Sequence, residues 1–239
     1  MTHRHTTTSG HASADPGALI RWPGRYDLLV TLALVGRGGR VRSQIGEALD
    51  LSPGQRVLDV GCGTGTLTLA LATRVGPGGT AIGVDASEQM IAAAQRKATD
   101  RGLPVRFEVA PAQALPYPDE YFDAVATSLM IHHLPASDRR AAVTEMLRVL
   151  RPGGRLVIAE FQASRWALGR RVTEHVLGHS MATNSLDAVV ELAAAAGVEE
   201  PTRSATAVGW LGLVAGRKPV GVSSASPAGS QSPTVEPGD

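Results

Sequence analysis

The sequence is poor in cysteine, in aromatic residues and in long apolar runs. Its single cysteine, Cys62, cannot form an internal disulfide or supply a cysteine cluster for zinc, and it is compatible with a reducing compartment. The longest strongly apolar stretch, 28–35, has less than half of the roughly 20 residues that a membrane-spanning helix needs. The N-terminus has no apolar core of the kind found in secretory signals. We therefore expect a cytoplasmic protein without a transmembrane segment.

An excess of charge of either sign is also missing. The 23 basic and 22 acidic residues leave a net charge of +1. A protein that binds a nucleic-acid backbone or an anionic membrane usually presents a basic surface, so neither is an expected partner. Of the 23 basic residues only Lys97 and Lys218 are lysines. The expected partner is a small molecule, and the sequence leaves the oligomeric state open.

The length of 239 residues, with 43% hydrophobic residues, suits one α/β domain with two tails. The first 17 residues scatter three histidines among Thr, Ser and Gly, and residues 218–239 are more than half Pro, Gly and Ser. We expect both of these ends to be disordered. The domain then covers 18–217, and its first segment, 19–50, is predicted to form a helical lid of two amphipathic helices broken at Gly36, Gly38 and Gly39.

Between the tails, short β-rich runs alternate with helical periods, which is the pattern of a parallel sheet covered by helices. The expected strands are Arg56–Val60, Thr80–Val84, Val105–Val109, Phe122–Ser128, Leu156–Glu160 and, as an antiparallel pair, Thr202–Val208 and Gly209–Gly216. The expected helices are Gly65–Val75, Ser87–Asp100, Ser137–Leu150 and about Ser185–Ala196. The predicted fold class is therefore α/β, with a doubly wound, mostly parallel seven-stranded sheet, helices on both faces and an antiparallel edge.

The most informative segment is VLDVGCGTG, residues 57–65, in which a strand leads into an acidic residue and three alternate glycines before a helix begins. Glycines at such a turn let a ligand lie against bare backbone. A glycine-rich turn alone also suits NAD, a nucleotide phosphate or tight packing. The dinucleotide fingerprint, however, has its third glycine one position later, where this chain has Thr66.

Two carboxylates help to separate these alternatives. Asp59 directly precedes the glycine turn, where its charge would oppose a pyrophosphate but can accept from an ammonium group. Asp85 ends the next strand, where one carboxylate can accept hydrogen bonds from both hydroxyls of a ribose. Together they indicate an adenosine-type ligand that bears an amino group.

This arrangement resembles the class I S-adenosylmethionine-dependent methyltransferases, and three further landmarks follow in the family's order. They are Asp85-Ala86-Ser87 followed by Met90, the stretch ALPYPD with YFD (114–119 and 121–123), and RVLRPGG (148–154). The resemblance covers about 100 residues. It implies the methyltransferase fold, S-adenosyl-L-methionine as cofactor, and transfer of a methyl group to a small acceptor.

The resemblance also implies residue roles at the cofactor. The glycine turn lies under the methionine and ribose, Asp59 reaches the amino end, Asp85 holds the ribose, Met90 packs on the adenine, and Ser128 lies beside the methionine portion. The implied cofactor-binding set is Asp59, Gly61, Gly63, Thr64, Gly65, Asp85, Ala86, Met90, Ala112, Gln113 and Ser128. One departure is clear: Pro111 stands where the family usually has an Asp for the adenine amino group. The amide oxygen of Gln113 is a candidate substitute, while the backbone N–H of Ala112 is expected to serve the ring.

Methyl transfer needs alignment and exclusion of water, and a positioned base helps when the acceptor is a hydroxyl. His132 and His133 follow the fourth strand, and Glu160 ends the fifth. Because these two strands are expected to be parallel neighbours, a His-Glu pair is predicted there, with His133 slightly favoured over His132 as the base. The other interpretation is that one histidine only packs in the loop. The His132-His133-Leu134 segment, followed by an acid after the fifth strand, resembles small-molecule and sugar O-methyltransferases.

Several alternatives stay open. The pair Tyr26-Asp27 also resembles quinone-biosynthesis C-methyltransferases and their phospholipid N-methylating relatives. Rivals of other classes are an NAD-dependent oxidoreductase and a non-catalytic S-adenosylmethionine-binding protein. A metal site is not expected, because His175 and His179 at i, i+4 lack a third ligand. Aromatic residues at Trp22, Tyr26 and 161–166 are expected to line the acceptor site.

Overall fold

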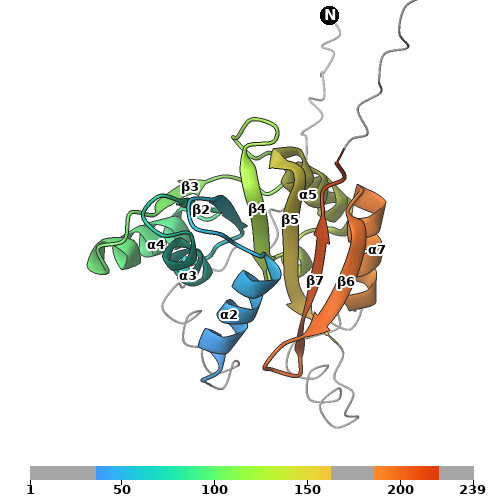
Figure 1. The fold of residues 1–239 in the computed structure, drawn as a ribbon, viewed down its shortest axis with the longest axis horizontal. Helices are drawn as coiled ribbons and strands as arrows, with labels where there is room; N and C mark the ends of the chain where they lie inside the picture. Colours follow the sequence, from blue (N-terminus) through green and yellow to red (C-terminus); the bar gives the residue numbers. More distant parts are fainter. Residues whose placement is uncertain (1–35, 163–185, 221–239) are drawn as a thin grey trace, which may run out of the picture.

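The computed structural model describes residues 36–162 and 186–220. Within them a single seven-stranded sheet has the order β3-β2-β1-β4-β5-β7-β6 (Figure 1). Strands β1 to β5 pair in parallel, and β7 lies antiparallel between β5 and β6. The strands are β1 Arg56–Val60, β2 Thr80–Asp85, β3 Arg106–Val109, β4 Phe122–Ser128, β5 Leu150–Phe161, β6 Glu199–Ala205 and β7 Leu211–Arg217. The predicted doubly wound sheet with an antiparallel edge is confirmed.

Helices cover both faces of the sheet, as the alternation of side chains along the strands requires. On one face Leu58 and Ile158 pack with α5 and α7, and on the other Val57 and Val157 pack with α2 and α3. Helix α4 packs beside α3 over β3, where it buries Phe107. The helices are α2 Gly38–Ala48, α3 Thr66–Val75, α4 Glu88–Asp100, α5 Ala136–Val149 and α7 Leu186–Ala196, with a short 3₁₀ turn η1 at Ile131–His133.

The fifth strand is much longer than predicted because the Pro-Gly-Gly turn lies inside it. Phe122 of β4 pairs with Leu150, but Ala124 pairs with Arg155, so extra residues bulge out of β5 between these two pairs. Gly153 has φ +73°, and a Cβ at Gly154 would lie 2.9 Å from the carbonyl oxygen of Asp123. The two glycines therefore lie in a bulge within β5, where sequence alone would place them at the end of helix α5.

The β6–β7 hairpin and the chain after it also differ from the predicted boundaries. Its tip covers 206–210, where the Thr206 hydroxyl donates to carbonyl oxygens and accepts from the amide of Val208. Beyond β7, the backbone of Lys218 exchanges two hydrogen bonds with Gly153 and Gly154. Ordered pairing thus extends one residue past the predicted domain end at 217.

Helix α2 is the described part of the predicted lid. It begins at Gly38, so Gly38 and Gly39 lie in its first turn and do not break a helix, whereas Gly36, with φ +70°, lies outside it. Val41, Ile45 and Leu49 are buried against α3 and the sheet. This segment therefore belongs to the helical layer. The rest of the predicted lid, Trp22, Tyr26, His175, His179 and residues 163–166 lie outside the described residues.

Residues 36–162 and 186–220 contain neither a membrane-spanning helix nor a cluster of metal ligands. None of their helices combines the length and apolar character needed to cross a membrane. No group of three or more His, Cys, Asp or Glu side chains in this part of the chain is placed to hold a metal ion.

Candidate active site

The glycine turn between β1 and α3 adopts a backbone that excludes side chains. Gly61, Gly63 and Gly65 have φ of +70°, +53° and +74°, a region that glycine enters without steric cost. A Cβ at Gly61 would overlap the side chain of Met130, and one at Gly65 would lie 2.5 Å from Phe107 Cζ. The missing side chain at Gly61 thus lets Met130, which follows β4, approach the turn. At Gly65 it lets Phe107 of β3 and Ala94 of α4 pack against the turn.

Asp85 at the end of β2 bonds directly to this turn. Its carboxylate accepts from the backbone N–H of Gly63 and from that of Ser87, both at 2.9 Å. Ser87 in turn caps α4 by accepting from the amide of Met90. Ala86 beside it is exposed, and Met90 is buried. Burial raises the pKa of Asp85 above its ordinary value, and the two backbone N–H groups oppose that rise.

Asp59 is buried below the glycine turn, with 1% of its surface exposed. Its Oδ2 accepts from the hydroxyl of Thr68 on α3 at 2.6 Å. Burial raises the pKa of Asp59 to about 7, with a further contribution from the negative charge of Asp85. Asp59 and Asp85 therefore form a carboxylate pair on adjacent strands, below and beside the glycines.

The segment after β3 brings Ala112 and Gln113 to the same edge of the sheet. Ala112 is buried, and Gln113 Nε2 donates to Asp138 Oδ2 in the first turn of α5 at 3.1 Å. This bond turns the amide nitrogen of Gln113 towards α5 and leaves its oxygen on the other side of the amide plane. Pro111, where the related family has its acid, has no side chain that can replace it.

Arg148 of α5 explains why two of the sequence landmarks occur together. Its guanidinium donates to the carbonyl oxygens of Leu115 and Tyr117, to Asp119 and to Glu145. Glu145 also accepts from the amide of Leu115. The stretch 114–119 is therefore held to α5 by charge-assisted hydrogen bonds. These residues support the loop that carries Ala112 and Gln113.

Thr64 and Ser128 complete the predicted cofactor-binding set. Thr64 is 3% exposed, and its hydroxyl accepts from Lys97 Nζ of α4 at 2.8 Å. Ser128 ends β4, where its Cα partner is Ala159 of β5. The structure thus brings the glycine turn, Asp85 and Ser128 to the carboxyl edge of neighbouring strands, the usual place for ligands in open α/β sheets.

His132 and Glu160 form a buried pair at the same edge. His132 Nδ1 lies 2.8 Å from Glu160 Oε1, and Glu160 Oε2 accepts from the backbone N–H of His132 at 3.2 Å. Glu160 is 1% exposed and also accepts from the amide of Phe161. An ionised carboxylate can only accept, so with Glu160 in that form Nδ1 carries the proton of a neutral imidazole and Nε2 is its basic atom.

His133 differs from His132 in its surroundings. The two residues lie in the 3₁₀ turn η1, in which successive side chains are about 120° apart. Their ring centroids are 4.0 Å apart, yet the direct contact to Glu160 belongs to His132, and His133 is the more exposed of the two although part of it is shielded from solvent. Partial burial and the neighbouring His132 lower the pKa of His133 below its ordinary value. The predicted pair with Glu160 therefore exists at His132, although the sequence analysis slightly favoured His133.

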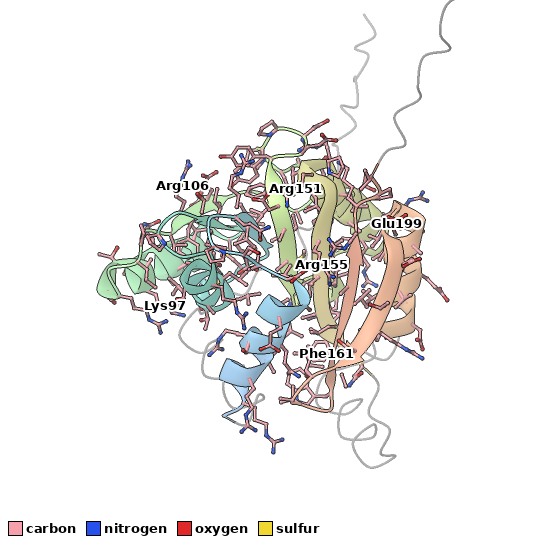
Figure 2. All side chains as sticks on the ribbon, in the orientation of Figure 1. Lys97, Arg106, Arg151, Arg155, Phe161 and Glu199 are labelled. Atoms are coloured by element: carbon pink, nitrogen blue, oxygen red, sulfur yellow. The ribbon has the colours of Figure 1, made fainter. Side chains whose placement is uncertain are left out.

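Trp210 lies beside the candidate site, although no sequence pattern pointed to it. It lies at the tip of the β6–β7 hairpin and stacks on Phe161, with ring centroids 5.4 Å apart. The rings of Phe161 and His132 meet edge-on, with centroids 4.9 Å apart. Phe161 lies at the opposite end of β5 from Arg151 (Figure 2). We call His132, Phe161 and Trp210 the ring cluster. The rarity of aromatic residues in this chain was the only sequence signal for Trp210.

Comparisons with known proteins agree with this geometry. A sequence family described as a methyltransferase domain matches residues 57–154. The demethylmenaquinone methyltransferase of Thermus thermophilus is 46% identical over 138 residues, 57% of this chain and 61% of that protein. The ubiquinone/menaquinone biosynthesis C-methyltransferase of Geobacter sulfurreducens is 40% identical over 152 residues, 62% of this chain and 58% of that protein. The chain thus spans less than two thirds of the length of these relatives.

The fold has a solved counterpart of similar size. A structure described as a SAM-dependent methyltransferase from Aquifex aeolicus superposes with a TM-score of 0.66 at 23% identity, and the match covers 81% of this chain and 97% of that one. The matched family segment includes the glycine turn, Asp85, the 114–119 stretch and the β5 bulge in the predicted order. Residues 57–154 are thus similar to a methyltransferase domain, and the fold is similar to that of the Aquifex aeolicus structure.

Proposed function

We propose that this protein transfers a methyl group from S-adenosyl-L-methionine to a small-molecule acceptor. The observation that carries the proposal is the Asp85 carboxylate bonded to the amide of Gly63, within a turn whose three glycines all have positive φ. A carboxylate at the end of the second strand suits the two hydroxyls of a ribose. When bound, the cofactor supplies an electrophilic methyl group on a positively charged sulfur.

The residues proposed to hold the cofactor come from four strand ends. The glycine turn contributes bare backbone, and Asp85 contributes the ribose acceptor. Asp59, buried below the turn, offers a carboxyl group to the amino end, and Ser128 lies at the end of the central strand. The adenine end is assigned to Ala112 and Gln113. The remaining members are Thr64, Ala86 and Met90, which flank these groups.

We assign the base to His132 when the acceptor is a hydroxyl. Its Nδ1–H donates to Glu160, so the ring is held in one tautomer with Nε2 unprotonated. Nε2 then accepts the proton that the hydroxyl loses as its oxygen gains the methyl group. Glu160 acts through His132 and is a positioning residue. His133, which is exposed and lacks a direct bond to Glu160, is the weaker candidate.

A second candidate function is C-methylation of a quinone precursor. It is favoured by the names of the two relatives and by the ring cluster, whose Phe161 and Trp210 lie next to His132. A planar acceptor can stack on such rings. The near-neutral charge of the chain favours a small acceptor over a nucleic acid. The cytoplasmic location expected from the single cysteine stays a prediction.

A product screen tests the proposal and separates its two forms. The purified protein is incubated with S-adenosylmethionine carrying a ¹³C-labelled methyl group and with pools of hydroxylated aromatics, glycosides and quinone precursors. A product heavier by one labelled methylene unit, located by NMR on oxygen or on ring carbon, assigns the acceptor atom. Failure to methylate any pool by a protein that binds the cofactor would favour the non-catalytic alternative.

A further inference from the structure

One of the two lysines in the chain holds both residues that flank the last glycine of the turn. Lys97 Nζ, on α4, donates to the hydroxyl of Thr64 at 2.8 Å and to that of Thr66 at 2.9 Å. These two hydroxyl oxygens are 3.5 Å apart. Thr64 is buried and Thr66 is half-buried. A single ammonium group therefore joins the two ends of the Thr64-Gly65-Thr66 segment.

The position of this ammonium group suits the helix that carries it but not the helix that it contacts. Lys97 lies in the last turn of α4, where a cation is favourable, and beside the first turn of α3. Gly65 is the N-cap of α3 and provides no side-chain cap, and Thr66 is the first helical residue. The N-terminus of a helix carries partial positive charge, so a cation beside it is unfavourable. A feature that breaks a local rule in this way needs a compensating role. Lys97 has one at the turn itself, because charge-assisted hydrogen bonds are among the stronger ones.

Helix α4 contacts the turn at a second point. A Cβ at Gly65 would lie 2.9 Å from Cβ of Ala94, one turn before Lys97 on the same helix. Ala94 is fully buried there. The turn is thus supported from the α4 side by a steric contact at Gly65 and by the ammonium group on either side of it. The same turn reaches Asp85 through Gly63.

We propose that Lys97 is a positioning residue for the cofactor: it holds Thr64 and Thr66 so that the Gly61–Gly65 backbone keeps its binding conformation before the ligand arrives. This inference rests on the proposed cofactor site. Pre-organised loops bind more tightly because less ordering is left to occur on binding. Loss of the ammonium group therefore weakens cofactor binding without removing any atom that touches the cofactor.

The test is calorimetric titration of S-adenosylhomocysteine into the full chain and its variants. Lys97→Met keeps most of the length and apolar stem but has no donor, and we expect its Kd to rise on the order of tenfold. Lys97→Arg keeps donors for both hydroxyls, and we expect it to restore most of the affinity. Arg96→Met is the matched control, since it removes a neighbouring exposed cation from α4. Its Kd should equal that of the unmodified chain.

A double-mutant cycle separates positioning from a general loss of stability. If Lys97 acts through the two hydroxyls, Lys97→Met should have almost no further effect on Kd in a Thr64→Val/Thr66→Val background. Thr66→Val alone gives a second route if Lys97→Met does not fold, and its Kd should rise about threefold. An unchanged Kd for Lys97→Met or for Thr66→Val, or a full effect of Lys97→Met in the valine background, would overturn the inference. Absence of binding by the unmodified chain would instead refute the proposed function.

Discussion

His132, in the turn η1 that follows β4, and Glu160, near the end of the neighbouring parallel strand β5, meet through two hydrogen bonds, one to the imidazole Nδ1 and one to the backbone N–H of His132. The carboxylate therefore fixes both the position of the residue and the tautomer of its ring. For a hydroxyl acceptor, His132→Ala should lower turnover by about a hundred- to ten-thousandfold with cofactor affinity within a few fold. Steady-state kinetics and calorimetry measure the two quantities separately.

His133→Ala is the internal comparison, because the residue is adjacent and lacks the direct bond to Glu160. Its turnover should fall less than tenfold if His132 is the base. A larger loss in His133→Ala than in His132→Ala would return the base to His133. Near-normal rates in both variants would refute a histidine base and indicate that the protein works only by aligning the acceptor with the cofactor.

Glu160→Gln replaces the carboxylate, whose two oxygens both accept hydrogen bonds, by an amide that has one accepting oxygen and one donating NH₂ group. Either the imidazole Nδ1–H or the backbone N–H of His132 then faces an NH₂ group in a buried site. We expect a loss of about 1–3 kcal/mol in the free energy of unfolding. Chemical denaturation measures it, with exposed Glu88→Gln as control. Equal stability of Glu160→Gln and the unmodified chain would contradict the hydrogen-bond assignment.

Because the pKa of Asp59 is raised in the folded chain, the free energy of unfolding should depend on pH. Its pKa is about 7 in the folded chain against an ordinary value of 3.8, so the folded state holds the proton over that interval. The contribution of Asp59 to the free energy of unfolding must then fall as the pH rises between these values, by at most about 1.4 kcal/mol per pH unit. Above the folded pKa the contribution stays at its low level.

Asp59→Asn keeps an acceptor for Thr68 and removes the charge. The variant should therefore gain stability relative to the unmodified chain as the pH rises towards about 8, and the gain should shrink towards about pH 4. Denaturation series of both proteins at several pH values give the difference. Parallel stability curves across this range would show that Asp59 titrates near its ordinary pKa.

The orientation of the Gln113 amide indicates how the adenine amino group is recognised without the acid that the family usually has at position 111. Because its Nε2 donates to Asp138, its oxygen is the atom left to accept from that amino group. The chain should bind S-adenosylhomocysteine about tenfold more tightly than S-inosylhomocysteine, in which a carbonyl oxygen replaces the amino group. Gln113→Leu should lose this preference, and exposed Gln95→Leu should keep it. Full preference in Gln113→Leu would move recognition to another group.

Much of this arrangement follows from short-range patterns. Arg56–Val60 and Phe122–Ser128 are apolar runs bounded by polar or glycine residues, and both strands have the predicted ends. The His-Glu pair was also predictable, because the carboxyl ends of parallel neighbours meet at one edge. Which of the two histidines contacts Glu160 was not predictable, because the sequence does not show in which direction successive side chains of the 3₁₀ turn point.

Other features depend on contacts between distant residues. The Pro-Gly-Gly segment signals a helix end, but its inclusion in β5 depends on pairing with β4 across a bulge. Trp210 reaches the site only because β7 inserts between β5 and β6 and places the hairpin tip beside Phe161. The bond from Lys97 to Thr64 joins residues 33 apart in sequence, for which no local pattern exists.

Asp85 is the residue on which the cofactor assignment depends most. Asp85→Ala removes the proposed ribose acceptor and also leaves the amides of Gly63 and Ser87 without this partner. Binding of S-adenosylhomocysteine should weaken by about 2–3 kcal/mol, and Asp85→Asn, which keeps one acceptor, should be intermediate. Exposed Asp100→Ala serves as control. An unchanged Kd in Asp85→Ala would place the ribose elsewhere.

The most direct measurement of the central claim is a paired calorimetric titration of the unmodified chain with S-adenosylhomocysteine and with NADH. The glycine spacing and the Asp59 carboxylate favour the first ligand and oppose the pyrophosphate of the second. We predict saturable one-to-one binding of S-adenosylhomocysteine and no measurable heat of binding with NADH under the same conditions. Binding of NADH, or no binding of S-adenosylhomocysteine at any accessible concentration, would contradict the account.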